Sequence, residues 1–231
     1  MKTIGLIGGT TWESTKEYYQ IINEAVQLSA GGYHSAKILL YSVDFQEIRT
    51  LSEMDDWDSL AKMFVSIGRK LEAAGAEILL LCANTLHKVY DDVQRQLNIP
   101  VLHIADVLAK EVEKTGLKTL GLLGTRITME SDFYISRLKD RFGIETIVPD
   151  KAGREIVNTI IFDELAKGII RHESRQKLIE ISEEMIANGA KAVVLGCTEL
   201  SLILKPSHFD VPVFDTLLIH AASAANFAVK N

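Results

Sequence analysis

The feature that most constrains the fold is an internal repeat at a spacing of roughly 112–117 residues. The matching pairs are "TIGLIGGT" (3–10) with "TLGLLGTR" (119–126), "TWES" (11–14) with "TMES" (128–131), "AEILLLCANT" (76–85) with "KAVVLGCTE" (191–199), and "IPVLHIAD" (99–106) with "VPVFDTLL" (211–218). Self-similarity of this length predicts two similar lobes related by a pseudo-twofold axis.

Each lobe is predicted to be α/β, because short apolar runs alternate with amphipathic stretches. The expected strands are 3–8, 36–43, 76–82, 100–104, 119–124, 145–149, 192–196 and 212–215, and the clearest expected helices are 14–27, 57–75 and 173–189. Continuous apolar strands between helices indicate mostly parallel sheets that are flanked by helices. We expect an N-terminal lobe of residues 1–104 plus 214–231, completed by a final helix, and a C-terminal lobe of 105–213. Ligands of such sheets bind beyond the carboxyl ends of the strands, so an active-site cleft is expected between the lobes.

The composition excludes several classes of protein. With 231 residues, 47% of them hydrophobic, and a net charge of −6, the chain is typical of an acidic globular protein without a nucleic-acid surface. No apolar run is long enough to cross a membrane, and "MKTIGLIGG" has no signal-peptide pattern. We expect a cytoplasmic protein whose two cysteines are reduced thiols.

The two cysteines end corresponding apolar runs, but the repeat offsets them by one residue. Aligning Gly196 with Cys82 places Cys197 opposite Ala83. Side chains alternate across a strand, so a thiol at 197 that points into the cleft has Ala83 as its symmetry mate, while Cys82 points into the layer between sheet and helix. Cys197 lies where a helix is expected to begin, and a helix N-terminus would lower the pKa of its thiol.

Small polar side chains follow four of the expected strands. They are Thr10, Thr11, Asn84, Thr85, Thr125, Thr128 and Thr198, with Trp12 beside them at the rim. Such hydroxyl, amide and backbone N–H groups can bind a carboxylate without a cation, although Thr and Asn also cap helices. His87 is expected to be a satisfied structural group or to support the residues that touch a ligand. Cys82 and His87 lack a second pair of ligands, so no metal site is expected, and "GLIGG" lacks the dinucleotide fingerprint.

With these residues in place, the sequence resembles the cofactor-independent aspartate/glutamate racemase family over essentially its whole length. The motifs that carry the resemblance are "GLIGG", "NT-x-H", "GLLGT" and "LGCTEL". The resemblance implies two α/β lobes, a homodimer, an amino-acid or other small carboxylate substrate, and no pyridoxal phosphate or other cofactor. In this family one cysteine on each side of Cα removes or returns the proton.

Carried over by position, Cys197 is the catalytic thiol, and Thr198 and Glu199 follow it as a substrate ligand and a supporting residue. The other catalytic position falls on Ala83, so one of the two acid/base groups is absent. Three outcomes stay open: a racemase that is asymmetric toward the L-enantiomer, a one-sided proton-transfer enzyme of the arylmalonate decarboxylase type, or a non-catalytic protein that binds a small carboxylate. Arg49, Arg126 and Lys167 are the candidate cations for a second substrate carboxylate, and each could equally be a surface residue.

Overall fold

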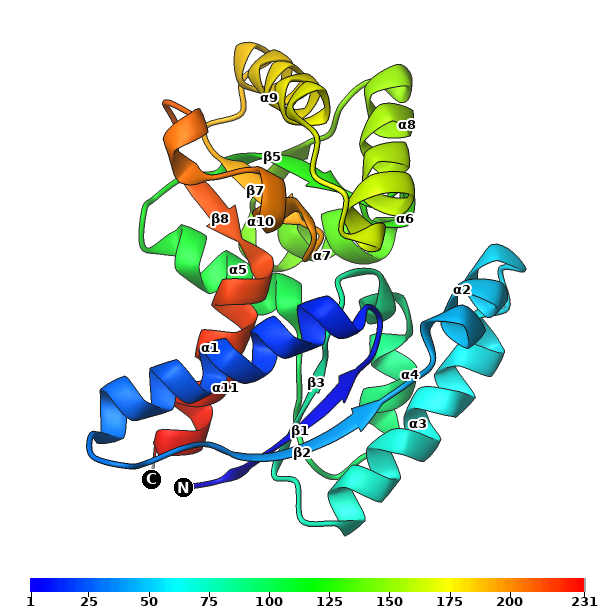
Figure 1. Ribbon diagram of the computed structural model, residues 1–231, viewed down its shortest axis with the longest axis vertical. Helices are drawn as coiled ribbons and strands as arrows, with labels where there is room; N and C mark the ends of the chain where they lie inside the picture. The colour runs from blue at the N-terminus through cyan, green and yellow to red at the C-terminus, as the bar shows by residue number, and fades with distance from the viewer. Residues whose placement is uncertain (231) are drawn as a thin grey trace. The chain divides into compact units, whose positions relative to one another are not determined.

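A computed structural model describes residues 1–230 of the chain (Figure 1). The chain divides into two compact units, Met1–His103 with the segment from His220 onward, and Ile104–Ile219. The limits of the expected lobes, 1–104 with 214–231 and 105–213, lie close to the limits of these units. That the lobes act as functional domains stays a prediction. Within the described residues, no helix combines the length and the apolar character that a membrane crossing requires.

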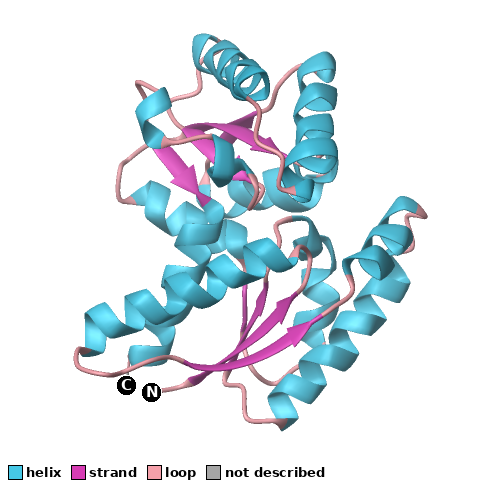
Figure 2. Cartoon of the chain, in the orientation of Figure 1, coloured by secondary structure: helices cyan, strands magenta, loops and turns pink. Residues whose placement is uncertain are grey.

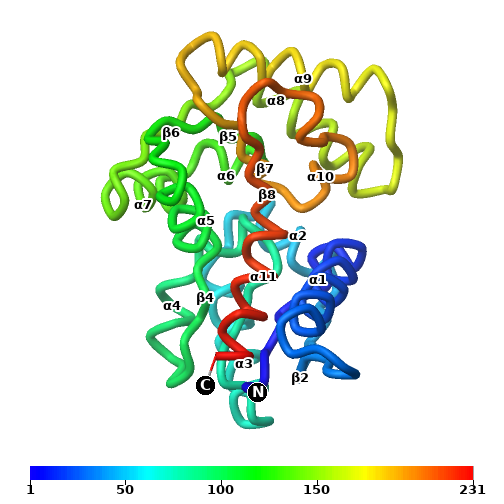
Figure 3. Tube along the Cα trace, turned by 90° about the vertical axis from the view of Figure 1, so that its left-hand side faces the viewer, coloured from blue at the N-terminus to red at the C-terminus, as the bar shows by residue number. Residues whose placement is uncertain are grey.

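Unit 1 is a parallel four-stranded sheet in the order β2-β1-β3-β4, covered by helices on both faces. Its strands are β1 (Thr3–Gly8), β2 (Lys37–Ser42), β3 (Ile78–Leu81) and β4 (Val101–Leu102). Its helices are α1 (Trp12–Ala30), α2 (Phe45–Glu53), α3 (Trp57–Ala73), η1 (Thr85–Val89), α4 (Tyr90–Arg95) and the part of α11 (Thr216–Val229) from His220 onward. Figures 1 and 3 show α1 and α11 on one face of this sheet and α3 on the other.

Unit 2 is a second parallel four-stranded sheet, in the order β6-β5-β7-β8. Its strands are β5 (Thr119–Gly124), β6 (Glu145–Ile147), β7 (Val193–Gly196) and β8 (Val213–Asp215). Its helices are α5 (Ile104–Glu113), α6 (Arg126–Glu130), α7 (Asp132–Phe142), α8 (Lys151–Thr159), η2 (Ile160–Glu164), η3 (Leu165–Lys167), α9 (His172–Ala187), α10 (Leu200–Ile203) and η4 (Pro206–His208). In Figure 2 the strands of each unit lie between layers of helix.

The two sheets repeat one strand order, which confirms the α/β fold that the internal repeat predicts. In each unit the first strand of the repeat pairs with the second on one side and the third on the other. All eight expected strands form. The predicted limits 3–8 and 119–124 agree best with the structure, because they are the limits of β1 and β5. The expected strand at 100–104 is reduced to Val101–Leu102, because α5 begins at Ile104.

The strands of unit 2 contribute side chains to two apolar cores, one on each face of the sheet. Leu122 and Val194 point to the core that α5 and α7 cover, whereas Leu123, Val193 and Leu195 point to the core beneath α8 and α9. This alternation follows from the two-residue period of a strand, and burial on both faces explains why the runs read as continuous apolar segments.

Candidate functional site

In unit 1 the first group of candidate residues lies in the turn from β1 to α1. Gly9 has a φ of +93°, and a Cβ there would lie 2.3 Å from the carbonyl oxygen of Val43, so only glycine fits this turn. Thr11 caps α1, and its hydroxyl accepts a hydrogen bond from the backbone N–H of Ser14 at 3.4 Å. The buried hydroxyl of Thr10 has no hydrogen-bond partner among the described residues. Trp12, the next residue, is 67% exposed.

The second group in unit 1 lies where β3 ends and η1 begins. Asn84 is buried, while Ala83 and Thr85 are partly exposed. The carbonyl of Ala83 meets Nδ1 of His87 at 3.0 Å, and the backbone N–H of His87 donates to the carbonyl of Asn84 at 3.1 Å. His87 is therefore bonded to the turn that carries the candidate carboxylate donors, and its role in supporting a ligand site stays a prediction.

Next to this turn lies a group of histidines and tyrosines in which Tyr18, His87, His103 and His220 are buried and Tyr90 is partly buried. The rings of His87 and His103 lie 4.7 Å apart, those of His87 and His220 lie 5.6 Å apart, and those of Tyr90 and His103 lie 4.5 Å apart. Nδ1 of His220 meets the Tyr18 hydroxyl at 2.9 Å, and its Nε2 meets the carbonyl of Leu102 at 2.9 Å. Burial first, and then the neighbouring His87, lower the pKa of His220 to about 3, so this imidazole is neutral.

In unit 2 the turn from β5 to α6 repeats the capping chemistry of the turn from β1 to α1. The Thr125 hydroxyl accepts a hydrogen bond from the backbone N–H of Thr128 at 3.3 Å, and the two hydroxyls lie 3.1 Å apart. Thr125 thus corresponds structurally to Thr11, both being the cap of the helix that follows the first strand of a unit. These cap bonds occupy the threonines, so their role as substrate ligands stays a prediction.

Cys197 lies directly after β7, in a turn that Gly196 makes possible. A Cβ at Gly196 would lie 2.8 Å from the carbonyl oxygen of Leu123 on the neighbouring strand, so a larger residue would push the strand ends apart. The thiol of Cys197, 8% exposed, donates a hydrogen bond to Oε2 of Glu199 at 3.0 Å. The Thr198 hydroxyl donates to the same oxygen at 2.8 Å.

The expectation that a helix N-terminus lowers the pKa of Cys197 is wrong for this structure. The helix that follows, α10, comprises only Leu200–Ile203, and a helix this short has a weak dipole. Burial is the largest cause of the opposite shift, and the carboxylate of Glu199 adds to it, so the pKa of Cys197 lies well above its usual range. The resting residue is a neutral thiol.

Cys82 has the surroundings of a core residue. Its side chain is completely buried, and burial raises the pKa of its thiol far above the ordinary value. Its backbone N–H donates to the carbonyl of Ile7 at 3.0 Å, which continues the pairing of β3 with β1. Cys82 is buried while the next residue, Ala83, is partly exposed, in accord with the one-residue offset that the repeat predicts.

The three candidate cations each lie at the surface beside an acidic side chain. Arg49 pairs with Glu53 at 2.7 Å, Lys167 with Asp163 at 3.3 Å, and Arg126 with Glu155 at 3.9 Å. The structure therefore does not single out one of them. Their side chains are 45%, 56% and 58% exposed, respectively, so each of these pairs contributes little to stability and could open for an anionic ligand.

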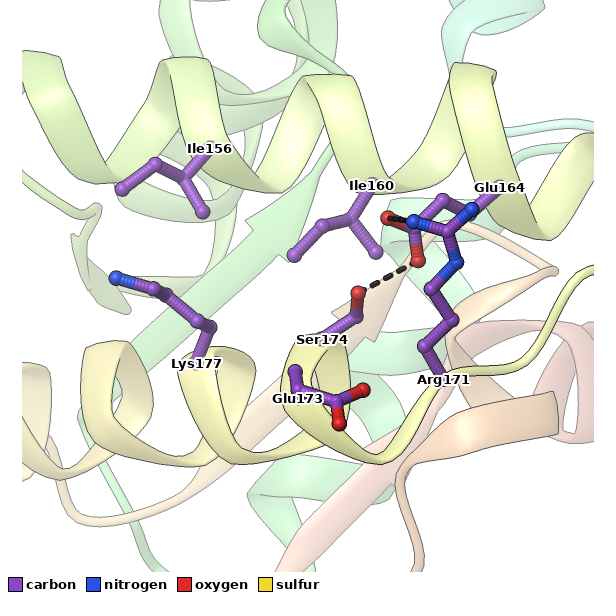
Figure 4. A pocket seen from close by; sticks show the side chains of 7 residues that line it. All are labelled: Ile156, Ile160, Glu164, Arg171, Glu173, Ser174 and Lys177. Atoms are coloured by element: carbon purple, nitrogen blue, oxygen red, sulfur yellow. Dashed lines mark hydrogen bonds and ion pairs between the residues drawn. The ribbon is translucent and has the colours of Figure 1, made fainter.

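A surface pocket of about 410 Å³ in unit 2 is separate from these groups. Figure 4 shows its lining, which consists of Ile156, Ile160, Glu164, Arg171, Glu173, Ser174 and Lys177. Ser174 donates to Glu164 at 2.5 Å, and Arg171 lies 3.7 Å from the same carboxylate, so these three polar groups of the pocket are engaged with each other. Across residues 1–230, His, Cys, Asp and Glu side chains form no cluster of three that could hold a metal ion.

Sequence reasoning missed His103 and Tyr18, which complete the group of histidines and tyrosines next to the turn at Ala83. No motif marks them, since Tyr18 and His220 are 202 positions apart. Glu199, the expected supporting residue two positions after the thiol in "GCTE", is the side chain that accepts from the Cys197 thiol.

Comparison with known proteins gives consistent matches over nearly the whole chain. The model of the Asp/Glu/hydantoin racemase family matches residues 7–224. The broad-specificity amino-acid racemase RacX of Bacillus subtilis is 27% identical over 228 residues, which are 96% of each chain. A crystal structure of a Yersinia pestis protein assigned to the Asp/Glu racemases is 46% identical with a TM-score of 0.94, and that of an aspartate racemase homologue from Pyrococcus horikoshii OT3 is 38% identical with a TM-score of 0.87; each covers 100% of both chains.

Proposed function

The chain belongs to the Asp/Glu/hydantoin racemase family, and on that premise we propose that it is a cofactor-independent amino-acid racemase that acts on aspartate, glutamate or both. Cys197 removes and returns the Cα proton on one face of the substrate. Ala83 stands at the position from which a second thiol would serve the other face, so the enzyme is asymmetric and favours deprotonation of the L-enantiomer.

The observation that carries this proposal is the thiol of Cys197 with its acceptor. It lies at the carboxyl end of a central parallel strand, where ligands of such sheets bind. It is hydrogen-bonded to a carboxylate at 3.0 Å, so a proton acceptor is already in contact with the sulfur. Cys82, by contrast, is buried in the core of unit 1 and has no part in the proposal.

The reaction balances with one thiol and water. The thiolate of Cys197 takes the Cα proton of the L-substrate, an S–H bond forms, and the C–H electron pair moves into the substrate carboxylate. On the face of Ala83 a water molecule supplies the new Cα proton, and the proton held at Cys197 passes to the hydroxide that remains. Because water is a weaker acid than a positioned thiol, return of the proton on this face is the slow step.

Polar groups at the other strand ends are the proposed ligands of the substrate carboxylate. Asn84 and Thr85 in unit 1 and Thr198 in unit 2 supply amide and hydroxyl donors, and the unbonded hydroxyl of Thr10 is a further candidate. Donors aimed at this carboxylate stabilise the enolate-like transition state, in which the negative charge of the carbanion is spread over its oxygens.

The test is Cα–H exchange in deuterated buffer with L- and D-aspartate and L- and D-glutamate, followed by proton NMR, with chiral chromatography of the same samples. We expect exchange of an L-acid and slower accumulation of its D-form. Cys197→Ala should lower the exchange rate at least about 100-fold, the range of a lost acid/base group. Ala83→Cys should speed interconversion, because it restores a thiol at the second position.

The matched control is Cys82→Ala, which removes the other thiol of the chain and should leave the exchange rate per folded molecule unchanged. Absence of exchange with all four amino acids would refute racemisation of acidic substrates. The second candidate, one-sided proton transfer after decarboxylation of a malonate-type acid, is favoured by the alanine at position 83, and product formation from such an acid would then support it.

The residue that binds a second substrate carboxylate is sought among Arg49, Arg126 and Lys167. Replacing the relevant one by Gln should raise KM for aspartate or glutamate by about tenfold or more, since a charged hydrogen bond contributes 1.5–3 kcal/mol. The other two replacements are the controls. If none of the three changes KM, the side-chain carboxylate is bound by neutral donors instead.

We also propose that the enzyme is a homodimer in the cytoplasm, as its resemblance to the family implies. Sedimentation equilibrium of the purified chain tests the first part, and a mass close to that of one 25.6 kDa chain would refute it.

A further inference from the structure

The group in contact with the Cys197 thiol is itself buried and charged. Glu199 is 6% exposed, its Oε2 accepts from the Cys197 sulfur at 3.0 Å, and the same oxygen accepts from the Thr198 hydroxyl at 2.8 Å. Two donors therefore converge on one oxygen, which suits a carboxylate. All three residues belong to the turn after β7, so their relative positions are set by a few backbone angles.

The surroundings of this pair are apolar. Cys197 belongs to the core cluster that contains Leu123 of β5, Met129 of α6 and Leu200 of α10. Five charged side chains on the elements around that cluster are engaged elsewhere: Glu130 with Arg154, Arg126 with Glu155, Glu164 with Ser174, Arg175 with the carbonyl of Ile203, and Asp215 with the amide of Leu217. Among residues 1–230, Glu199 is the charged side chain that shifts the pKa of Cys197.

A thiolate is difficult to form in such a place if its proton must leave the site. The carboxylate already carries one negative charge, and a second charge beside it would be unfavourable in a medium that stabilises charge poorly. Transfer of the proton from sulfur to Oε2 has no such penalty, since the pair holds one proton and one negative charge before and after the transfer. The hydrogen bond at 3.0 Å supplies the path for this transfer.

We propose that Cys197 and Glu199 share one proton, and that Glu199 carries it while Cys197 acts as the thiolate. The proposal deepens the racemase function and rests on it for its catalytic meaning. In the resting state the S–H bond is intact and Glu199 is ionised. When the thiolate is needed, the S–H bond breaks and an O–H bond forms at Oε2. The thiolate then accepts the Cα proton. After that proton has passed to the hydroxide left on the face of Ala83, the proton on Glu199 returns to the sulfur and restores the resting pair.

The test is the pH dependence of Cys197 alkylation by iodoacetamide, with the modified residue located by peptide mass spectrometry. A shared proton makes the thiolate fraction independent of pH while exactly one proton is present on the pair, so the wild-type rate should be flat from about pH 6 to about pH 8. In Glu199→Gln the proton must leave to solvent, and the rate should rise about tenfold per pH unit over the same range. Glu199→Asp keeps a carboxylate and should restore part of the flat profile.

Glu164→Gln is the matched control, because it removes a part-buried carboxylate of the same unit that is bonded to Ser174, and its profile should remain flat. The proposal is overturned if the wild-type rate itself rises about tenfold per pH unit, a measurement that needs no variant to fold. Parallel slopes for wild type and Glu199→Gln would reduce Glu199 to a structural acceptor. A flat profile without Cα exchange would instead refute the racemase function and leave the shared proton standing.

Discussion

The neutral state of His220 makes the stability of unit 1 sensitive to acid. This imidazole is completely buried between the Tyr18 hydroxyl and the carbonyl of Leu102. Its pKa is lowered from the ordinary 6.5 to about 3 in the folded chain. The unfolded chain therefore binds a proton at this residue below about pH 6.5, whereas the folded chain does not until about pH 3.

The sign and size of the effect follow from these two pKa values. Above the pKa of the unfolded chain, His220 is neutral in both states and does not change the free energy of unfolding. As the pH falls below that value, the unfolded chain binds a proton at His220 that the folded chain cannot bind. The free energy of unfolding then decreases by about 1.4 kcal/mol per pH unit. Over the whole interval between the two pKa values the loss is about 5 kcal/mol, an upper bound because a strained fold can relax around the charge.

Urea unfolding at a series of pH values from about 7 to about 4.5 measures this slope. His220→Gln removes the titrating group and keeps a side chain that can donate and accept, so its stability should decrease less steeply with acid by about 1.4 kcal/mol per pH unit. The control is His34→Gln at an exposed histidine, which should follow the wild type. If the wild type and His220→Gln gave parallel plots, the buried imidazole would be protonated without penalty and the reasoning would fail.

Three further substitutions should change the free energy of unfolding, which urea titration measures: one should raise it and two should lower it. Tyr134→Phe should stabilise by about 1 kcal/mol, because its buried hydroxyl has no hydrogen-bond partner among the described residues. Tyr18→Phe should destabilise by about 1–3 kcal/mol, because it leaves His220 without the partner at 2.9 Å; equal effects of the two changes would contradict this reading. Gly196→Ala should destabilise by about 1–3 kcal/mol and slow Cys197 alkylation. Gly121→Ala is its control and should have a smaller effect, because a Cβ there would have no neighbour nearer than 3.3 Å. A larger effect of Gly121→Ala than of Gly196→Ala would be evidence against the close approach of the strands at Gly196.

Much of the fold could be predicted because the strands and helices of each unit are marked by patterns of neighbouring residues in the sequence. Runs such as "TIGLIG" and "TLGLLG" are apolar throughout, which is typical of strands buried on both faces, and the repeat indicates that the second unit copies the first. Gly75 and Gly189, the last residues of the predicted helices 57–75 and 173–189, have positive φ values, a backbone conformation that favours glycine where a helix ends. These features depend on neighbours in the chain, so sequence patterns record them.

The electrostatics of the site could not be predicted in the same way. The position of Cys197 after a strand suggested an acidic thiol, but its pKa depends on how deeply the core encloses it and on the direction of the Glu199 carboxylate. The contact of Tyr18 with His220 joins α1 to the last helix, and the rings of His103 and Tyr90 pack with their centroids 4.5 Å apart. Contacts of this kind arise from tertiary structure, and no short pattern in the sequence reports them.

The discontinuity of unit 1 sets an order for folding during synthesis. The unit consists of Met1–His103 and the segment from His220 onward, so all of unit 2 must be synthesised before unit 1 has both of its segments. The segment that is synthesised last contributes Ala221, Ala224 and Ala228, all of which are buried. The apolar surface of unit 1 that packs against these alanines therefore stays exposed until α11 has been synthesised. Unit 2, continuous from Ile104 to Ile219, has no such delay. During translation the first half of the protein to emerge is therefore the last to be completed.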